Sequence, residues 1–472
     1  MARTTGTSAE RRLFLLSLAL SAAFLMETLD STILVAALPA IAADFGVPVL
    51  SVNLAVSLYL MVMAATIPAS GWLADRLGAK RLFLGAMVAF MLTSLGAALA
   101  TDLQTLVAMR ILQAIAGALM TPVGRLLLIR NAPPDQLAAA IAWMSMPALV
   151  GPILGPLVGG YLVTYASWQW VFAVKLPFGI AGLILASRLL PADQPRPAQR
   201  FDSGGFLYCA VVLGAAQLLL EQLVHGFLSS EQVAALLFSM ALALLAAGRH
   251  FRRCANPVLD PRLLHLPLFR TALFAGGLSR LGLNALPFLL QLQLQLGFGW
   301  SAARAGWVVL CIALSALLLK PLMRVVLSRY GFRRTLAGNA ALAALTMVLL
   351  AGFSADAPWP PLVLVVLVFG VSRSLQFNAI NTLMYAEIPA AQQSASTTLG
   401  SVGQQLAMGL GISVAAVLVS QLQQLGVALP ATAISGAMLA IAALTALSSG
   451  LFLSLAPDAG AAVSGAGIPK KA

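Results

Sequence analysis

Charged residues are scarce in this chain of 472 residues: Asp, Glu, Lys and Arg together make up only 9%, whereas 60% of the residues are hydrophobic. The mean hydropathy is +0.94. A soluble globular protein of this length does not need so much apolar surface, so the composition excludes an ordinary soluble enzyme or binding domain. The chain instead contains a series of long, mostly apolar runs, each of which predicts a membrane-spanning helix.

Cysteine and histidine are also rare, with three residues of each. Cys209, Cys254 and Cys311 have no paired spacing, which predicts neither a disulfide nor a metal site. No combination of Ser, Thr and His resembles a nucleophile arrangement, and no glycine-rich phosphate loop follows a strand. We therefore expect a protein that is not an enzyme, binds no cofactor and does not draw its energy from ATP.

The apolar runs number fourteen and predict an all-α multi-pass membrane protein, because lipid offers no hydrogen-bond partner to an exposed backbone N–H or C=O. The predicted spans are 13–36, 50–73, 82–100, 103–129, 138–163, 168–190, 204–223, 231–248, 271–296, 303–323, 335–354, 360–386, 396–421 and 431–455.

The 28 Lys and Arg residues give the chain a net charge of +13, which by itself could indicate a nucleic-acid partner. Their distribution argues against that partner, because most lie in alternate loops and the intervening loops hold only Arg304. The positive-inside rule then places both termini in the cytoplasm. The N-terminus has no cleavable signal pattern, since its first apolar run is too long and contains Glu27 and Asp30.

The segment 71–81, Gly-Trp-Leu-Ala-Asp-Arg-Leu-Gly-Ala-Lys-Arg, joins two apolar runs and carries four charges. The acid Asp75 has no counterpart in a fainter copy 253 residues later, where Ser328 takes its place. A loop repeated at half-protein spacing predicts two related halves. The matched positions are Pro68 and Pro321, Arg76 and Arg329, Gly78 and Gly331, Lys80 and Arg333, Arg81 and Arg334, and, further on, Gly117 and Gly370.

The repeat predicts a bundle of six helices at each end of the chain, with two extra helices between them. The segment 191–205 is a linker by composition, because it is polar and rich in Pro and Gly. The predicted parts are a cytoplasmic N-terminus (1–12), an N-terminal six-helix bundle (13–190), linkers with two extra helices (191–270), a C-terminal six-helix bundle (271–455) and a cytoplasmic tail (456–472).

Five short motifs occur in order along the chain: LDSTILVAALP at 29–39, the loop 71–81, RILQAIAG at 110–117, GPILGPLVGG at 151–160 and WQWVF at 168–172. Together they resemble the major facilitator superfamily, and most of all its fourteen-helix drug:proton antiporters of the EmrB/QacA type. The chain departs from the family pattern at Ala114, where glycine is usual, at Gln169, where Arg is common, and at Lys175, where Asn is common. The resemblance implies the major facilitator fold, two six-helix bundles plus two inserted helices.

The resemblance also implies that the loop 71–81 is a gating loop. We expect Asp75 to latch the cytoplasmic side of the first half through Arg76 or a neighbouring helix N-terminus. The gating-loop residues are Gly71, Asp75, Arg76, Gly78, Lys80 and Arg81.

The motif at 151–160 resembles the antiporter motif. Glycines four residues apart let two helices approach closely. The resemblance implies a pliable interface between the halves that seals against proton leak, and helix packing alone is the simpler alternative. The motif residues are Gly151, Gly155, Pro156, Gly159 and Gly160.

Glu27 and Asp30 are three residues apart in the first span, so they share one face of a helix near mid-membrane. A charge at that depth costs roughly 2.5–3.5 kcal/mol on insertion scales, so it needs a cavity, a partner or a proton. They are the only acids that we place deep in the bilayer. One interpretation is a proton-coupling site of Glu27, Asp30 and Arg110; the alternative is a fixed ion pair, for example of Asp30 with Arg110.

Four arginines within predicted spans, Arg110, Arg125, Arg280 and Arg373, outnumber these two acids. Arg does not deprotonate in proteins, so each charge needs an acid, a helix C-terminus, water or a substrate. We expect Arg110 to pair with the first span. Arg125 either lines the cavity or reaches the cytoplasmic face. Arg280 and Arg373 either attract an anionic substrate or donate to neighbouring carbonyls.

Amide side chains add to this candidate cavity in the second half. Pairs spaced i, i+3 or i, i+4 share a helix face. Polar faces on several spans predict a wet cavity, and hydrogen bonding between helices is the alternative. The amides are Asn284, Gln291, Gln295, Asn378, Asn381, Gln404 and Gln405.

The resemblance implies a secondary transporter that exports small molecules, amphiphilic drugs above all, against proton entry by alternating access. The expected partners are a small-molecule substrate, protons and the lipid bilayer of the bacterial cytoplasmic membrane, without nucleic acid. We expect a monomer to suffice, and a periplasmic adaptor stays an open question. The basic excess inside the membrane favours one alternative substrate, an organic anion such as a carboxylate. A membrane receptor or enzyme would need a nucleophile, a metal site or a soluble domain, and the repeat argues against a channel.

Overall fold

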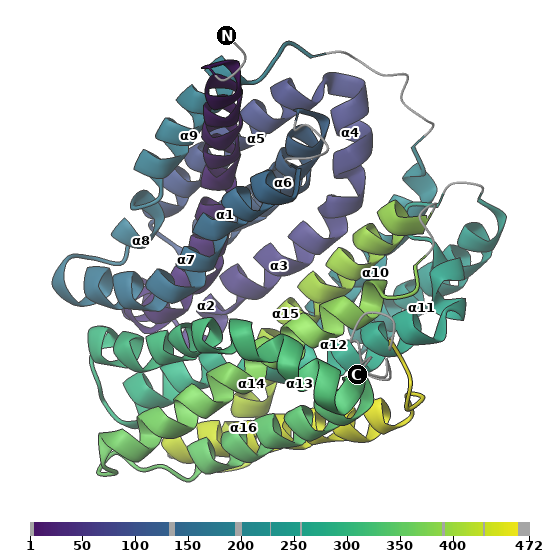
Figure 1. Ribbon diagram of the computed structural model, residues 1–472. Coiled ribbons are helices and arrows are strands. Elements are labelled where there is room, and N and C mark those ends of the chain that lie inside the picture. The colour runs from purple at the N-terminus through teal and green to yellow at the C-terminus, as the bar shows by residue number, and fades with distance from the viewer. Residues whose placement is uncertain are drawn as a thin grey trace. The chain divides into compact units, whose positions relative to one another are not determined.

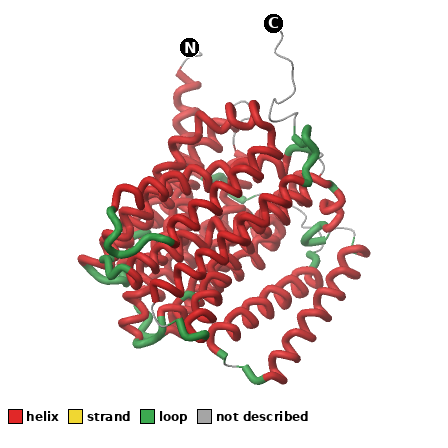
Figure 2. Tube along the Cα trace, turned by 90° about the horizontal axis from the view of Figure 1, so that it is seen from below, coloured by secondary structure: helices red, strands yellow, loops and turns green. Residues whose placement is uncertain are grey.

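The computed structural model describes residues 4–131, 137–193, 201–226, 228–254, 257–388, 392–427 and 430–460. Every regular element within these ranges is a helix, and none is a strand (Figure 2). The predicted all-α fold is therefore confirmed. Residues 461–472 of the predicted tail and 194–200 of the predicted linker lie outside the described residues.

The chain divides into two compact units, Met1–Phe206 and Leu207–Ala472. In the first unit, α1 packs against α7 and α9, and α6 packs against α3 and α5 (Figure 1). Its elements are α1 (Thr4–Phe45), α2 (Val49–Val52), α3 (Leu54–Thr66), η1 (Ile67–Ala69), α4 (Ser70–Leu77), α5 (Ala79–Ala98), α6 (Leu103–Asn131), α7 (Leu137–Tyr165), α8 (Trp170–Ala173) and α9 (Leu176–Leu189).

The boundary between the units falls inside α10, whose residues after Phe206 belong to the second unit. In that unit α12 packs against α15 and α16, and α13 packs against α14 and α16. Its elements are α10 (Ser203–His225), α11 (Ser230–Arg253), η2 (Pro261–His265), α12 (Pro267–Leu292), η3 (Gln293–Gly297), α13 (Ala302–Ala351), α14 (Trp359–Tyr385), α15 (Gln393–Gln424) and α16 (Pro430–Leu453).

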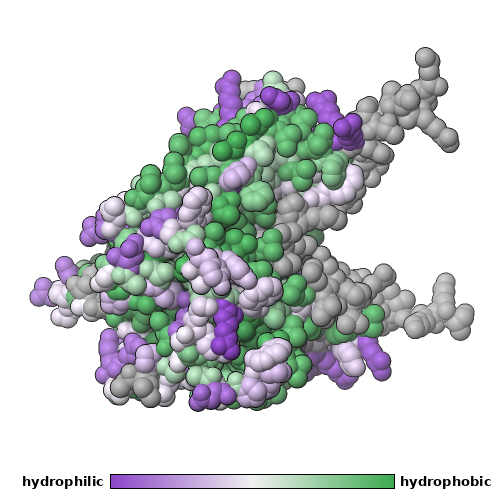
Figure 3. Space-filling view, turned by 90° about the vertical axis from the view of Figure 1, so that its left-hand side faces the viewer, coloured by the Kyte–Doolittle hydropathy of each residue, from purple (hydrophilic) through white to green (hydrophobic). Residues whose placement is uncertain are grey.

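Among the described residues, 12 helical segments are long and apolar enough to cross a membrane. The helix α7 and the first part of α13 coincide with the two other predicted spans, 138–163 and 303–323. Large apolar side chains such as Phe238 and Leu242 are exposed, and Figure 3 shows hydrophobic side chains spread over one face of the molecule. Apolar outer surfaces of this extent suit lipid rather than water.

The predicted span 168–190 is interrupted, because α8 ends at Ala173 and α9 begins only at Leu176. Lys175 is the N-cap residue of α9, and a proline, Pro177, stands in the first turn. Proline has no N–H and favours the start of a helix, so the break has a local cause. It places a lysine at the junction of two helices within one span.

Two pairs of glycines that the predicted repeat matches have similar backbones or surroundings in the structure. Gly78, between α4 and α5, has φ +93°, and its counterpart Gly331 has φ +69° at a kink inside α13. Both positions need the left-handed backbone that glycine tolerates. A Cβ at Gly117 would meet Tyr59, and a Cβ at Gly370 would meet Ile312, which lies 253 residues after Tyr59. Equivalent glycines thus face equivalent positions in the two units.

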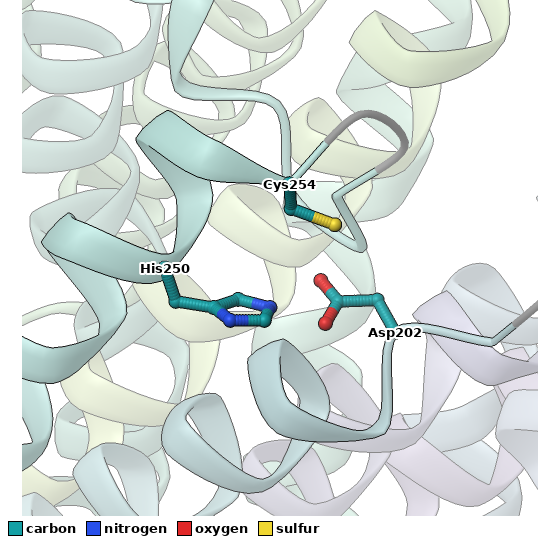
Figure 4. Close-up of side chains that lie close together, drawn as sticks. All are labelled: Asp202, His250 and Cys254. Carbon is teal, nitrogen blue, oxygen red and sulfur yellow. The ribbon is translucent and has the colours of Figure 1, made fainter.

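The two extra helices form a hairpin. Tyr208 near the start of α10 stacks edge-on against His250 near the end of α11, with ring centroids 5.7 Å apart. Figure 4 shows His250 on α11 and Cys254 directly after it, and the Cys254 N–H donates to the His250 carbonyl at 2.9 Å. The two helices are therefore antiparallel neighbours.

The hairpin is held to α15 by polar contacts at the end of α10. The Ser420 hydroxyl donates to the Val224 carbonyl at 3.1 Å, and the Gln421 amide donates to the Leu223 carbonyl at 2.6 Å. These carbonyls belong to the last turn of α10, where the helix itself supplies no donors. The contacts therefore fix the end of α10 to α15 within the second unit.

Candidate transport site

Asp30 on α1 is held by two cations. Arg110 of α6 donates from Nη1 to Oδ2 at 2.5 Å, and the Lys175 ammonium donates to Oδ1. All three side chains are buried, with 0% of Arg110 and Lys175 and 1% of Asp30 exposed. A buried charge is tolerated only when it is paired and hydrogen-bonded, and this triad meets that condition for the carboxylate.

Arg110 has several further partners that fix its direction. Nε donates to the Ala55 carbonyl at 3.1 Å and Nη1 donates to Gln113 Oε1 at 2.6 Å. The guanidinium carbon lies 3.9 Å from the centre of the Tyr59 ring, a cation–π contact. The expected pairing of Arg110 with the first span is therefore present, and the fixed ion pair weighed for Asp30 exists.

Lys175 is the residue of this triad that sequence reasoning missed. Its Nζ lies 5.5 Å from the Phe90 ring centre and 5.2 Å from the Phe172 ring centre, so aromatic faces from α5 and α8 surround the ammonium. The available signal was a lysine inside an apolar run, at a position where the family commonly has Asn. The sequence could not show that a residue 145 positions away would reach Asp30.

Glu27 lies on the same face of α1 but has a different environment. It is half-buried, and it accepts a hydrogen bond from the hydroxyl of Thr121 on α6. Arg125, one turn further along α6, is exposed and attracts Glu27 electrostatically. Both acids of α1 thus face α6, as their spacing predicts. Asp30 has two cationic partners at contact distance, whereas Glu27 accepts its hydrogen bond from Thr121, a neutral group.

In the second unit, the candidate arginines pair with candidate amides. Arg280 donates from Nη2 to Asn381 Oδ1 at 2.7 Å, and Arg373 donates from Nη2 to Asn284 Oδ1 at 3.1 Å. The Arg280 guanidinium also lies 5.2 Å from the Phe377 ring centre. Among the described residues neither arginine forms an ion pair, so neutral oxygens solvate these two charges.

The remaining amides are not gathered into the same cluster. Gln291 is buried on α12, whereas Gln295 is half-buried in the π-helical turn η3 that continues α12. Asn378 is exposed and donates to the Ser374 carbonyl of its own helix. Gln404 and Gln405 are half-buried on α15. The predicted shared face of Gln291 and Gln295 stays a prediction.

A polar network between α13 and α14 was missed from the sequence. Asn339 donates to Gln376 Oε1 and to the Ser372 carbonyl, both at 2.8 Å. The Ser372 hydroxyl returns a bond to the Asn339 carbonyl at 3.1 Å. All three side chains are buried, so this network is a structural bridge between two helices.

A third acid on a predicted span, Glu221 near the end of α10, is buried within the protein, whereas the prediction that only Glu27 and Asp30 lie deep in the bilayer stays a prediction. Glu221 on α10 is 6% exposed and accepts from Gln217 at 3.1 Å. Gln217 in turn accepts from Ser413 of α15 at 3.4 Å. The acid escaped attention because it falls near the end of the predicted span 204–223.

The gating loop has partners that the sequence did not reveal. Asp75 pairs with Arg130 in the last turn of α6 at 2.8 Å, rather than with Arg76 or a helix N-terminus as expected. Arg76 instead lies over the ring of Trp72 at 5.1 Å. The two members of the pair are 24% and 37% exposed, so this is a partly solvated contact across the end of the first unit.

The glycines of the antiporter motif face α1. A Cβ on Gly151 would clash with Thr28, one on Gly155 with Thr32, and one on Gly159 with the Ile33 carbonyl. The Thr32 hydroxyl also donates to the Gly151 carbonyl at 3.3 Å. The resemblance implied an interface between halves, but this glycine face packs α7 onto α1 within the first unit.

A family model and curated relatives match most of this chain. The model of the Major Facilitator Superfamily matches residues 20–253 and 272–469. "Putative multidrug resistance protein MdtD" of Cronobacter sakazakii is 38% identical over 396 residues, 84% of each chain. The protein of the same name from Pectobacterium carotovorum subsp. carotovorum is 37% identical over 402 residues, 85% of this chain and 86% of the relative. The five motifs also predict a resemblance to MdtD, and these matches confirm it.

Solved structures share the fold at low sequence identity. A POT family transporter in complex with 5-aminolevulinic acid gives a TM-score of 0.69 at 15% identity, covering 95% of this chain and 96% of that chain. A D-xylose-proton symporter gives 0.68 at 14% identity, covering 95% and 99%. These likenesses confirm the predicted fold class. With the family model and the relatives, they establish that the chain belongs to the major facilitator superfamily, a family of multi-pass membrane transporters rather than enzymes.

Proposed function

We propose that this transporter exports amphiphilic small molecules from the cytoplasm by exchanging them for protons, with Glu27 as one proton-exchanging group. The observation that carries the proposal is the contrast on one face of α1. Asp30 is paired with the two cations Arg110 and Lys175, whereas the half-buried carboxyl of Glu27 receives a hydrogen bond from the neutral Thr121. A carboxyl in that setting can hold either a proton or a cationic substrate, which is what an antiporter needs.

The relatives support the substrate class only by their name, multidrug resistance protein. Alternating access of the two units would present the Glu27 region first to one side of the membrane and then to the other. The loop at 71–81 and its pair of Asp75 with Arg130 would act at the cytoplasmic end of this cycle. The alternating Lys and Arg loops support cytoplasmic termini in a bacterial inner membrane.

The test is proton-driven uptake of ethidium, a cationic dye, into inverted vesicles. We expect uptake by the native chain to depend on an imposed pH gradient and Glu27→Gln to reduce that dependence. The matched control is Glu231→Gln, an exposed acid in the first turn of α11, which should leave uptake unchanged. Gradient-driven uptake by Glu27→Gln at the native rate would contradict the role of Glu27.

A second candidate substrate is an organic anion such as a di- or tricarboxylate. Arg280 and Arg373 favour it, because in the described part of the second unit both guanidinium groups have amide oxygens rather than carboxylates as partners. An anionic substrate would supply the missing negative charge, because a guanidinium group can bind a carboxylate through two parallel hydrogen bonds.

The two substrate classes are separated in the same vesicles. If an anion is carried, di- and tricarboxylates should be taken up, and Arg280→Ala or Arg373→Ala should reduce that uptake while sparing ethidium. Arg252→Ala, an exposed arginine at the end of α11, is the control. Carboxylate uptake that both cavity variants leave intact would remove the support for an anion.

A further inference from the structure

We propose that Lys175 is a second proton-exchanging group of the transport cycle, releasing its proton when substrate binds and regaining it when substrate leaves. This inference rests on the proposed proton-coupled export. It concerns a residue that stands outside the five sequence motifs and is placed next to Asp30 only by the fold.

The charge count of the buried triad is the first argument. Asp30 contributes one negative charge, and Arg110 and Lys175 contribute two positive charges when both are protonated. All three side chains are buried, so the surplus positive charge is held away from water. An uncompensated buried charge is costly, and the loss of one proton from the triad removes it.

Chemistry selects which member gives up that proton. Arg110 cannot, because a guanidinium stays charged in proteins, and its contacts with Asp30, Gln113 and the Ala55 carbonyl hold it in place. A lysine amine can become neutral when buried, and buried lysines serve as bases for that reason. Lys175 is therefore the member of the triad that can exchange a proton while the pair of Asp30 and Arg110 persists.

The groups that surround Lys175, on the helices packed against it, are compatible with a neutral amine. The charged groups that face it are Asp30 of α1 and, through Asp30, Arg110 of α6. The aromatic rings of Phe90 on α5 and Phe172 on α8 flank the ammonium, and Glu27 lies three residues before Asp30 on α1. Apolar rings tolerate a neutral amine well, and they also attract an ammonium when it is present.

The step is a simple proton transfer. One N–H bond of the Lys175 ammonium breaks, its electron pair stays on nitrogen, and the proton passes to water on the cytoplasmic side. The Asp30 carboxylate then pairs with Arg110 alone. After substrate leaves on the opposite side, the amine takes one proton from water and donates again to Asp30. A cationic substrate brings the charge that the proton removes, so the site holds about the same charge throughout.

The test counts protons. Purified native protein in weakly buffered detergent solution is mixed with ethidium, and the protons released per dye bound are measured with a pH indicator. We expect Glu27→Gln to release fewer protons than the native chain but still some, and the double variant Glu27→Gln with Lys175→Arg to release none. Lys175→Arg keeps the positive charge beside Asp30 but cannot release a proton, so on its own it should lower the release by about one proton per dye. Lys471→Arg, near the end of the chain, is the matched control.

A direct readout follows Lys175 in the native protein. The chain has five lysines, so protein labelled with ¹⁵N at the lysine amines gives few resonances, and the resonance missing from Lys175→Met identifies the site. We expect this resonance to move from the ammonium to the neutral-amine position when native protein is saturated with ethidium. A resonance that stays at the ammonium position, or Lys175→Arg with native proton release, would overturn the inference. No proton release by the native chain would instead overturn the proposed function.

Discussion

Asp193 caps helix α5 at Lys80. Its Oδ1 accepts the Lys80 backbone N–H at 2.8 Å, and its Oδ2 accepts the N–H of Arg81 at 3.0 Å. The first N–H groups of a helix lack partners within it, and a carboxylate there also suits the helix dipole. The Lys80 ammonium donates in return to the Leu190 carbonyl at the end of α9, at 2.6 Å. A Cβ at Gly78 would occupy the place of the Asp193 carboxylate, so this motif glycine is needed for space as well as for its positive φ.

Removal of this distant cap should loosen the start of α5. We expect Asp193→Ala to lower the free energy of local opening there by about 1 kcal/mol, the usual cost of losing a capping side chain. Hydrogen exchange of the Lys80 and Arg81 amides measures the effect. Asp458→Ala, which removes an exposed acid, should leave both amides unchanged, and equal protection in Asp193→Ala would contradict the capping role.

The pair of Asp75 and Arg130 should contribute little to stability. Both side chains keep partial access to solvent, and exposed ion pairs are worth about 0.2–1 kcal/mol. A double-mutant cycle of Asp75→Asn and Arg130→Gln, followed by the apparent melting temperature in detergent, should therefore give a coupling within that range. A much larger coupling would mean that the pair is shielded from solvent, against the observed exposure.

The glycine face of α7 should be intolerant of any side chain. Gly155→Ala places a methyl group against Thr32 of α1, and overpacking of this kind costs about 1–3 kcal/mol. Gly85→Ala on α5 is the matched control, because a Cβ there meets nothing within 4 Å. Thermal stability in detergent should fall for the first variant only. Equal melting temperatures would show that α7 and α1 are more loosely packed than the contacts indicate.

Asp102 should make the start of α6 sensitive to acid. The backbone N–H of Thr105 donates to its carboxylate at 2.8 Å, as does the Thr105 hydroxyl, and these bonds lower the pKa of Asp102. A group whose folded pKa lies below its unfolded value stabilises the fold above the unfolded pKa, and that contribution is lost as the pH falls through the folded pKa. Hydrogen exchange at Thr105 should therefore be faster in Asp102→Ala than in the native chain near neutral pH. The difference should shrink on acidification below the usual titration range of aspartate. A difference that stays constant with pH would contradict this account.

The sequence predicted the helices well because a membrane imposes a simple rule. Lipid offers no hydrogen-bond partners, so a long apolar run must form its backbone hydrogen bonds within itself. Such a run therefore predicts a helix directly. The prediction fails where local chemistry interrupts the rule. Pro177 stands in the first turn of α9, and the helix of the predicted span 168–190 is interrupted just before it. In α13 the non-helical backbone of Gly331 separates two helices, as the two predicted spans 303–323 and 335–354 require.

Only part of the candidate site was predicted from the sequence, because some partners of the predicted residues lie far away along the chain. Asp30 and Arg110 lie in motifs, and Glu27 lies three residues before Asp30, so their roles could be inferred from residue type and position. Lys175 reaches Asp30 across 145 positions, and Asp193 reaches Lys80 across 113. Such partners are chosen by tertiary packing, and no local pattern encodes them.

The attachment of α10 to α15 has a consequence for how this transporter could be shortened. The end of α10 receives its hydrogen bonds from Ser420 and Gln421 of α15. Excision of α10 and α11 would leave these polar groups, with Ser413, facing hydrocarbon. A twelve-helix version of the chain would therefore need apolar replacements on α15 before it could insert stably. The hairpin is thus tied to the second unit through the end of α10, and its deletion would leave polar groups of α15 without these partners.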